Sequence, residues 1–344
     1  MTDYKPRKKH HYFWWFAVII VLLFGIFSVS LSIKTQLTLN QITVKNEGDP
    51  LPDVYLDLPT PGLLPEIKDS FIKPDPEPDR LDVLLLGIRG VDDPYGGSLS
   101  DAIVVASIDT KTHKAAMLSI PRDLYVYIPG QSQLRKVNFA YAEGRAVGGE
   151  AGGLRLARDV VANITGVHID HVVRIDFEAF QKIIDAVGGV TVYLDKDFVE
   201  PYQWSEEGEF RVPAGKNHMD GITALYYTRS RYSTSDFDRA RRQQQVLLAL
   251  RDRVMSLGVL TKPTFAFQIL DILGNHVRTD ATPQEIRKLI DLARTVSVDT
   301  INTKVLDTSA GGLLSQDTID GQYVLLPRTG TYEEIRALAK NLLQ

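Results

Sequence analysis

The chain has 344 residues, 44% of them apolar and 24% charged, and a formal net charge of −4. This length and composition support one or two domains with a sizeable core, and the slight acidity argues against a broad basic face for nucleic acid. The absence of cysteine excludes disulfides, thiolate metal sites and thiol nucleophiles.

A long uncharged stretch near the start of the chain, residues 12–33, follows four basic residues, Lys5, Arg7, Lys8 and Lys9. A helix that crosses a bilayer needs about 20 apolar residues, so we expect 12–33 to be a single transmembrane helix. The basic tail at 1–11 should then be cytoplasmic and everything after Ile33 extracytoplasmic. A cleaved secretory signal is the alternative, but its apolar region typically has only about 7–15 residues.

The segment 34–80 is rich in proline and contains eight of the chain's 17 prolines. Such a composition predicts a semi-rigid extended spacer, although 37–44 could form a short strand or extend the preceding helix. We expect the spacer to end near 73–79 and a single extracytoplasmic domain to occupy 81–344.

Three apolar runs of strand length, 81–88, 102–108 and 114–120, open this domain. Their continuous hydrophobicity predicts strands that are covered on both faces. A glycine-rich loop leads to Asp101 at the second run, and the third ends at Pro121-Arg122-Asp123. Ligands of open α/β sheets bind at the carboxyl edge of the strands. An ordinary surface turn with Arg122 paired to Asp123 is the other interpretation.

The rest of the domain alternates helical and strand patterns. Helices are expected at 136–143, 151–164, 177–187, 220–227, 237–257, 263–273, 283–293 and 332–343. Strands are expected at 171–176, 190–194, 303–306 and 323–326, with a hairpin excursion at 195–216. We therefore predict an α/β fold in which helices sandwich a central, mostly parallel or mixed sheet.

The stretch 226–245 concentrates positive charge and includes five arginines, Arg229, Arg231, Arg239, Arg241 and Arg242. Ser235 and Asp238 predict a helix start of the capping-box type. Arg239, Arg242 and Gln243 should share one face near that N-terminus, where free N–H groups favour an anion. Arg229 and Arg231 share a face if their segment is extended. Two guanidinium pairs suit a pyrophosphate; the other interpretation is a solvated surface helix.

Seven short motifs occur in one order along the chain. They are Leu84-Leu85-Leu86-Gly87, Ser100-Asp101, Ser119-Ile120-Pro121-Arg122-Asp123, Lys136-Val137-Asn138-Phe139-Ala140-Tyr141, Ile175-Asp176-Phe177 through Asp185-Ala186-Val187-Gly188-Gly189-Val190, Arg229-Ser230-Arg231, and Asp236-Phe237-Asp238-Arg239 with Arg242-Gln243. In this order they resemble the LytR-CpsA-Psr family of cell-envelope glycopolymer ligases over about residues 81–260.

The resemblance implies a phosphotransferase. It would move a glycan phosphate from a polyprenyl pyrophosphate-linked donor to peptidoglycan and leave polyprenyl phosphate. The family's pyrophosphate-binding residues correspond to Arg122, Arg229, Arg231, Arg239 and Gln243. Asp101 matches a carboxylate that binds Mg²⁺, and either Asp101 or Asp123 could act as the base. Fixed guanidinium groups and a divalent cation would neutralise the charge that develops on the pyrophosphate.

The lipid tail of such a donor requires an apolar groove. Its candidate walls are Leu154, Val161, Phe180, Ile184, Val246 and Leu250, although each of these residues taken alone fits an ordinary core position.

Two positions depart from the family pattern. Arg89 stands where many members have an acidic residue, and Leu99 stands where they have an arginine. Asp92 or Asp93 could complete a metal shell, or Arg89 could take over part of the cation's role. A polyprenyl pyrophosphate hydrolase and a non-catalytic polyprenyl phosphate or cell-wall binding protein are the alternative functions. Nucleic acid is not an expected partner, because the orientation rule places the arginines outside the cytoplasm.

Overall fold

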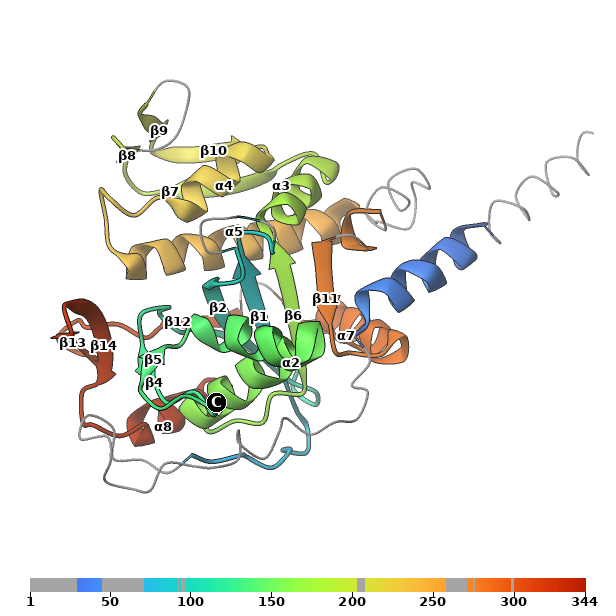
Figure 1. The fold of residues 1–344 in the computed structure, drawn as a ribbon. Coiled ribbons are helices and arrows are strands. Elements are labelled where there is room, and N and C mark those ends of the chain that lie inside the picture. Colours follow the sequence, from blue (N-terminus) through green and yellow to red (C-terminus); the bar gives the residue numbers. More distant parts are fainter. Residues whose placement is uncertain are drawn as a thin grey trace, which may run out of the picture.

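A computed structural model describes residues 30–44, 71–91, 93, 97–202, 208–257, 271–274, 276–297 and 300–344 (Figure 1). The chain folds around a six-stranded sheet whose spatial order is β11-β6-β1-β2-β3-β12. In that order the strands are Val277–Thr279, His171–Asp176, Arg80–Ile88, Ser100–Asp109, Ala115–Ser119 and Ile301–Val305.

The sheet is mixed. The pairs β1–β2, β2–β3 and β6–β11 are antiparallel, whereas β1–β6 and β3–β12 are parallel. Of the two sheet types predicted, the mostly parallel one is wrong. The connections 89–99 and 110–114 are shorter than the dozen or so residues that a parallel crossover requires, so β1, β2 and β3 pair as antiparallel neighbours.

The two faces of β1 have different surroundings. Leu84, Leu86 and Ile88 point into the main core, which is completed by α2 (Phe139–Thr165) and α8 (Glu333–Asn341). Leu85 and Gly87 face the opposite side, where they line a pocket. Because both faces are apolar, the strand reads as a continuous hydrophobic run, as the sequence predicted.

A second group of elements covers the pocket face. It consists of α3 (Phe177–Ala186), β7 (Val190–Leu194), β10 (Gly215–Met219), α4 (Gly221–Arg229) and α5 (Asp236–Leu257). These elements share a hydrophobic cluster that includes Ile184, Val192 and Val246. Figure 1 shows α3, α4, β7 and β10 gathered over one end of the sheet.

Most predicted elements are present with shifted ends. The helices expected at 136–143 and 151–164 form the single element α2, interrupted by non-helical backbone at Gly148 and Gly149. The first of them begins later than expected, because Arg135–Lys136 form β5, which pairs with β4 (Tyr125–Val126). The hairpin excursion is β8 (Phe198–Glu200) paired with β9 (Phe210–Val212). The remaining elements are α7 (Pro283–Thr295), β13 (Leu314–Ile319) and β14 (Gln322–Pro327).

The segment before the domain is partly helical. Residues 30–42 form a helix, and its buried Leu39 and Ile42 pack against Val277 and Ala179. Val44 then donates a backbone hydrogen bond to Thr279. No helix in the described part of the chain is long and apolar enough to cross a membrane. The span predicted at 12–33 lies outside the described residues up to residue 29, as do most of the helix predicted at 263–273 and the rest of the spacer up to residue 70.

Because the 30–42 helix packs against the domain, we expect the helix and the domain to unfold together in one cooperative transition. Ile42 is 5% exposed, and Ile42→Ala should lower the free energy of unfolding by about 2–4 kcal/mol through lost apolar contacts and a residual cavity. Leu37, 62% exposed on the same helix, supplies the control variant Leu37→Ala, which should unfold like the wild type. Urea denaturation measures both. An unchanged midpoint for Ile42→Ala would show that the helix does not take part in that transition.

Candidate active site

The pocket lies at the edge of the sheet where β1, β3 and β6 end and β2 begins. Its floor is set by strand register: Gly87 pairs with Ala102 on one side and with Ile175 on the other. Leu85 and Val104 form the next paired row, and all five residues line the pocket. The floor is therefore a continuous apolar surface beneath α3, α4 and α5.

Asp101 projects into this pocket because the ladder is irregular beside it. Gly87 pairs with Ala102, but Ile88 pairs with Ser100, so Asp101 is the extra residue of a β-bulge. Bulges re-aim side chains and are common next to active sites. The close approach also favours glycine at position 87, since a Cβ there would make a tight contact of 3.1 Å with the Cβ of Ala102.

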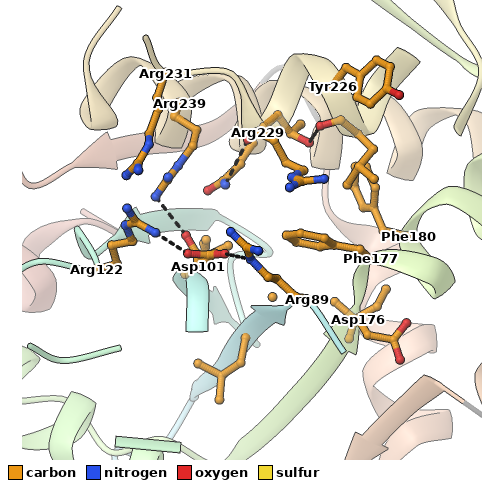
Figure 2. Close-up of a pocket in the computed structure, with 18 of the residues that line it drawn as sticks. Arg89, Asp101, Arg122, Asp176, Phe177, Phe180, Tyr226, Arg229, Arg231 and Arg239 are labelled. Carbon is orange, nitrogen blue, oxygen red and sulfur yellow. Dashed lines mark hydrogen bonds and ion pairs between the residues drawn. The ribbon is translucent and has the colours of Figure 1, made fainter. Parts of the chain in front are cut away.

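The described residues that line the pocket include five arginines and two aspartates: Arg89, Arg122, Arg229, Arg231, Arg239, Asp101 and Asp176. Figure 2 shows Arg122, Arg231 and Arg239 at one end, Asp101, Arg89 and Arg229 in the middle, and Phe177, Phe180 and Tyr226 at the other end. The pocket is thus polar and positive at one end and aromatic at the other.

Asp101 is the centre of the ion pairs. Arg122 Nη1 lies 2.5 Å from Asp101 Oδ1, and Arg89 Nε lies 3.7 Å from Asp101 Oδ2. Arg239 Nη2 donates to the backbone carbonyl of Asp101 at 3.2 Å. Burial disfavours the charge of Arg122, but the carboxylates of Asp101, Asp236 and Asp123 outweigh it and raise the pKa of its guanidinium.

Arg239 reaches the pocket from the first turn of α5. Ser235 caps this helix as predicted, because its Oγ accepts the N–H of Asp238 while its own N–H donates to the Asp238 carboxylate. Arg239 is 6% exposed and lies 2.9 Å from Asp236 Oδ1. Burial lowers the pKa of Arg239, which its pairing with Asp236 offsets only in part. Burial likewise raises the pKa of Asp236 against the opposing effect of Arg239.

Arg229 and Arg231 approach from the end of α4. Arg229 is the last residue of that helix, not part of an extended segment, and its guanidinium lies 4.8 Å from the centre of the Phe177 ring. Burial, reinforced by the nearby charge of Arg89, lowers the pKa of Arg229. Arginine stays protonated near neutral pH. The surroundings of Arg229 therefore stabilise its positive charge less than water does, and an incoming anion would add to that stabilisation.

Gln243 completes the polar wall, and its amide donates to the carbonyl of Thr228 at 3.3 Å. Asp123 takes no part in the wall. It accepts from Lys136 Nζ at 2.7 Å, lies 3.8 Å from Arg122 Nε and does not line the pocket. Leu99, the second departure from the family pattern, does not line it either.

The six residues expected in a lipid groove are distributed differently. Only Phe180 lines the pocket. Leu154 and Val161 are in the main core between α2 and the sheet, and the others, Ile184, Val246 and Leu250, are in the cluster that joins the covering elements. The expectation is corrected for these five, because their helices turn these apolar faces toward their own packing partners. The pocket wall is instead formed by Phe177, Leu225, Tyr226 and Leu247.

Helical spacing could have identified one of these wall residues. Leu247 lies four residues after Gln243 and eight after Arg239, so all three fall on one face of α5. Arg89 attracted attention only as a departure from a pattern. Its place beside Asp101 depends on the pairing of β1 with β2, which a single sequence does not reveal.

Arg242 and Arg241 are neighbours in sequence, but one side chain is buried and the other is exposed. Arg242 is 7% exposed and points away from the pocket, donating to the carbonyls of Tyr227 and Ser230 and to Thr234 Oγ1. It therefore ties the C-terminus of α4 to the following loop. Arg241 is exposed and pairs with Asp238 and Asp307, each at 2.8 Å.

The carboxylate of Asp101 is the best-placed ligand for the expected cation. Its Oδ1 is hydrogen-bonded to Arg122, whereas its Oδ2 has only the longer contact with Arg89. Within the described ranges, no group of three or more His, Cys, Asp or Glu side chains is arranged to hold a metal ion. Any cation at Asp101 would therefore need further oxygen ligands from a bound substrate and from water.

The fold and the pocket together define an α/β protein with a cluster of arginines at the mouth of an apolar cavity. The chain belongs to the LytR_cpsA_psr family, which matches residues 66–341, and the resemblance predicted from the motifs is confirmed.

Relatives with assigned names share part of the chain. It is 38% identical to the polyisoprenyl-teichoic acid–peptidoglycan teichoic acid transferase TagU of Oceanobacillus iheyensis. The match extends over 216 residues and covers 62% of this chain and 63% of that protein. It is 30% identical over 244 residues to the corresponding transferase TagT of Bacillus subtilis, 70% of this chain and 72% of that protein. The structure of TagT bound to LI-WTA superimposes with a TM-score of 0.58 at 26% identity, covering 80% of this chain and 94% of that one.

The contrast between Arg242 and Arg241 predicts a difference in stability between their alanine variants. Arg242→Ala should lower the free energy of unfolding by about 2–4 kcal/mol, because it removes a buried charge-assisted network and leaves carbonyl groups without donors. Arg241→Ala should change it by less than about 0.5 kcal/mol, as is usual for exposed positions. Thermal or urea unfolding of the two purified variants tests this. Equal stability of both would contradict a structural role for Arg242.

Proposed function

We propose that this protein transfers a glycan phosphate from a polyprenyl pyrophosphate-linked donor to peptidoglycan. The observation that carries the proposal is the pocket itself, where arginines with incompletely neutralised charge stand at the mouth of an apolar cavity. A polyprenyl pyrophosphate has the same two-part chemistry. The names of the relatives TagU and TagT, which specify a polyisoprenyl-linked polymer and peptidoglycan, support the same assignment.

The distribution of charge and apolar surface in the pocket supports one orientation of the donor. Its pyrophosphate lies among Arg122, Arg229, Arg231 and Arg239, whose planar guanidinium groups bind phosphate oxygens bidentately. Its lipid tail continues over the apolar floor toward Phe177 and Phe180, at the opposite end of the pocket in Figure 2. The glycan then leaves the pocket on the arginine side, where it can meet the acceptor.

The reaction is a displacement at phosphorus. A hydroxyl of the acceptor attacks the phosphorus that carries the glycan, and the bridging P–O bond to the lipid-linked phosphate breaks. The products are a glycan phosphodiester on peptidoglycan and polyprenyl phosphate, which takes the electron pair of the broken bond. Arginines fixed by ion pairs stabilise the charge on the leaving phosphate without having to reorganise.

The hydroxyl proton needs an acceptor within the pocket. Of the two aspartates considered from the sequence, Asp101 lines the pocket, whereas Asp123 is engaged by Lys136 behind Arg122. We therefore assign proton acceptance to Asp101. Arg89 and Arg122 orient its carboxylate from both sides.

Mg²⁺ belongs to the proposal as a cation shared between protein and substrate. Asp101 would hold it, with pyrophosphate oxygens and water as the other ligands, and its charge would assist the neutralisation of the phosphates. The arginines would still stabilise the phosphates in the presence of the cation, because ion pairs within the protein position Arg122 and Arg239.

The proposed setting is the outer surface of the cell membrane. We propose that 12–33 anchors the protein as a single-pass membrane protein with residues 1–11 in the cytoplasm, because the basic cluster precedes the apolar stretch. The pocket would then face the compartment that contains peptidoglycan. The domain that follows residue 80 would meet its lipid-linked donor at the membrane.

Two arginine variants test the site. Arg122→Ala and Arg239→Ala should each lower the rate of transfer by about 10²-fold or more, because each removes a fixed positive charge at the pyrophosphate. Arg241→Ala is the matched control on the same helix and should retain the wild-type rate. The assay follows glycan transfer with and without peptidoglycan, which separates transfer from hydrolysis. Full activity of either arginine variant, after circular dichroism has verified folding, would overturn the proposed site.

The shared-cation arrangement predicts that metal binding depends on substrate. Mn²⁺, used as a paramagnetic substitute for Mg²⁺, should bind about tenfold or more tightly when polyprenyl pyrophosphate is present, since the protein alone offers one carboxylate. Asp101→Asn should lose this gain. Electron paramagnetic resonance measures free Mn²⁺, with a protein-free sample correcting for binding to the lipid itself. Tight binding without pyrophosphate would contradict the arrangement.

A further inference from the structure

Two exposed tyrosines stand together at the mouth of the pocket. Tyr202 and Tyr232 are 70% and 64% exposed, and both line the pocket. Their ring centres are 6.2 Å apart at an interplanar angle of 78°, an edge-to-face pair. Single exposed aromatic residues are common on proteins. A pair of them beside a charged site leaves apolar ring surface open to whatever enters or leaves that site.

The backbones of both tyrosines are fixed by one buried carboxylate. Glu200, at the end of β8, has no exposed surface. Its Oε2 accepts the N–H of Tyr232 at 2.9 Å and that of Ser233 at 3.2 Å, and its Oε1 accepts the N–H of Tyr202 at 3.5 Å. A buried carboxylate requires such donors to offset its desolvation. Glu200 thereby joins two segments that are far apart in the sequence into one rim.

The buried side chain of Arg242 contacts both segments of this rim. This guanidinium donates to Ser230 O and Thr234 Oγ1, on either side of Tyr232, and lies 4.6 Å from the centre of the Phe198 ring on β8. Both segments that carry the tyrosines are thus anchored to the start of α5. The backbone that carries the pair is therefore positioned before any ligand arrives, which reduces the entropy lost on binding.

The position of the pair identifies the part of the donor that reaches it. Arg231 lies 5.7 Å from the centre of the Tyr232 ring. The lipid tail is placed at the end of the pocket formed by Phe177 and Phe180. In Figure 2, Arg231 is at the opposite end. Beyond the pyrophosphate on the arginine side, the donor continues as its first sugar. A sugar ring has apolar C–H faces and polar edges, which match tyrosine rings with exposed surface and hydroxyl groups.

We propose that Tyr202 and Tyr232 form a clamp for the first sugar ring attached to the pyrophosphate. This inference rests on the proposed function and adds a subsite to it. The clamp gives the donor site a preference for pyrophosphates that carry a sugar over those that do not, and it orients the glycan-bearing phosphorus toward the acceptor. Glu200 is a positioning residue that acts through the two tyrosines.

Binding of two probes to the full-length protein in detergent tests the clamp. The probes are farnesyl pyrophosphate and the same lipid pyrophosphate esterified with N-acetylglucosamine, and isothermal titration calorimetry gives Kd for each. The wild type should prefer the sugar-bearing probe. Tyr202→Ala and Tyr232→Ala should each weaken binding of that probe by about three- to tenfold, the range expected for one aromatic contact. Binding of farnesyl pyrophosphate itself should stay within about twofold of the wild-type value, because no pyrophosphate contact is lost.

Control variants separate a sugar contact from a change in structure. Tyr202→Phe and Tyr232→Phe keep the rings and should keep most of the preference. Tyr193 on β7 is 65% exposed but does not line the pocket, so Tyr193→Ala should bind both probes like the wild type. Alanine variants that lose both probes equally, or that keep the wild-type preference, would overturn the clamp.

The comparison of the two probes also separates the two proposals. A wild-type protein that binds both probes equally well refutes the clamp but leaves the pyrophosphate site standing. A wild-type protein that binds neither refutes the proposed function, and the clamp with it.

Discussion

The grouping of several guanidinium groups around one pocket depends on the carboxylate of Asp101. Positive charges at such short range repel one another, and the repulsion is strongest where water is partly excluded. Asp101 contacts Arg122 through one oxygen and Arg89 through the other, while its backbone carbonyl receives Arg239. Burial lowers the pKa values of Arg229 and Arg239, and the neighbouring carboxylates offset this effect only in part. The remaining positive charge makes the pocket receptive to a polyanion.

The fold supplies this arrangement with a rigid base and a covered apolar floor. The β-bulge beside Gly87 aims Asp101 into the pocket, and the register of three strands lays Gly87, Ala102 and Ile175 side by side beneath it. Buried groups outside the pocket then fix the elements that carry the arginines. Arg242 holds the turn after α4, and Glu200 joins that turn to β8. Stability and ligand binding are thus assigned to different charged side chains of the same region.

Sequence reasoning located the charged half of the site more successfully than the apolar half. The five polar residues that the motifs single out all line one pocket: Arg122, Arg229, Arg231, Arg239 and Gln243. Several motifs with charged residues seldom occur in a fixed order by chance, so a single sequence is enough to identify them. An apolar side chain on an amphipathic helix suits a core and a ligand groove equally well. The expected groove residues of α2 and α5, and Ile184 of α3, lie in hydrophobic clusters and do not line the pocket.

By itself, the sequence determined most of the strands and helices, the family and the arginines that could meet an anion. These follow from local hydrophobic periodicity, helix-capping residues and ordered motifs, all of which are encoded within short stretches. Only the tertiary structure decided the mixed sheet, the contact of Arg89 with Asp101 and the pairing of Tyr202 with Tyr232. Each of these depends on contacts between segments that are distant in sequence, and no local pattern specifies which distant segments become neighbours.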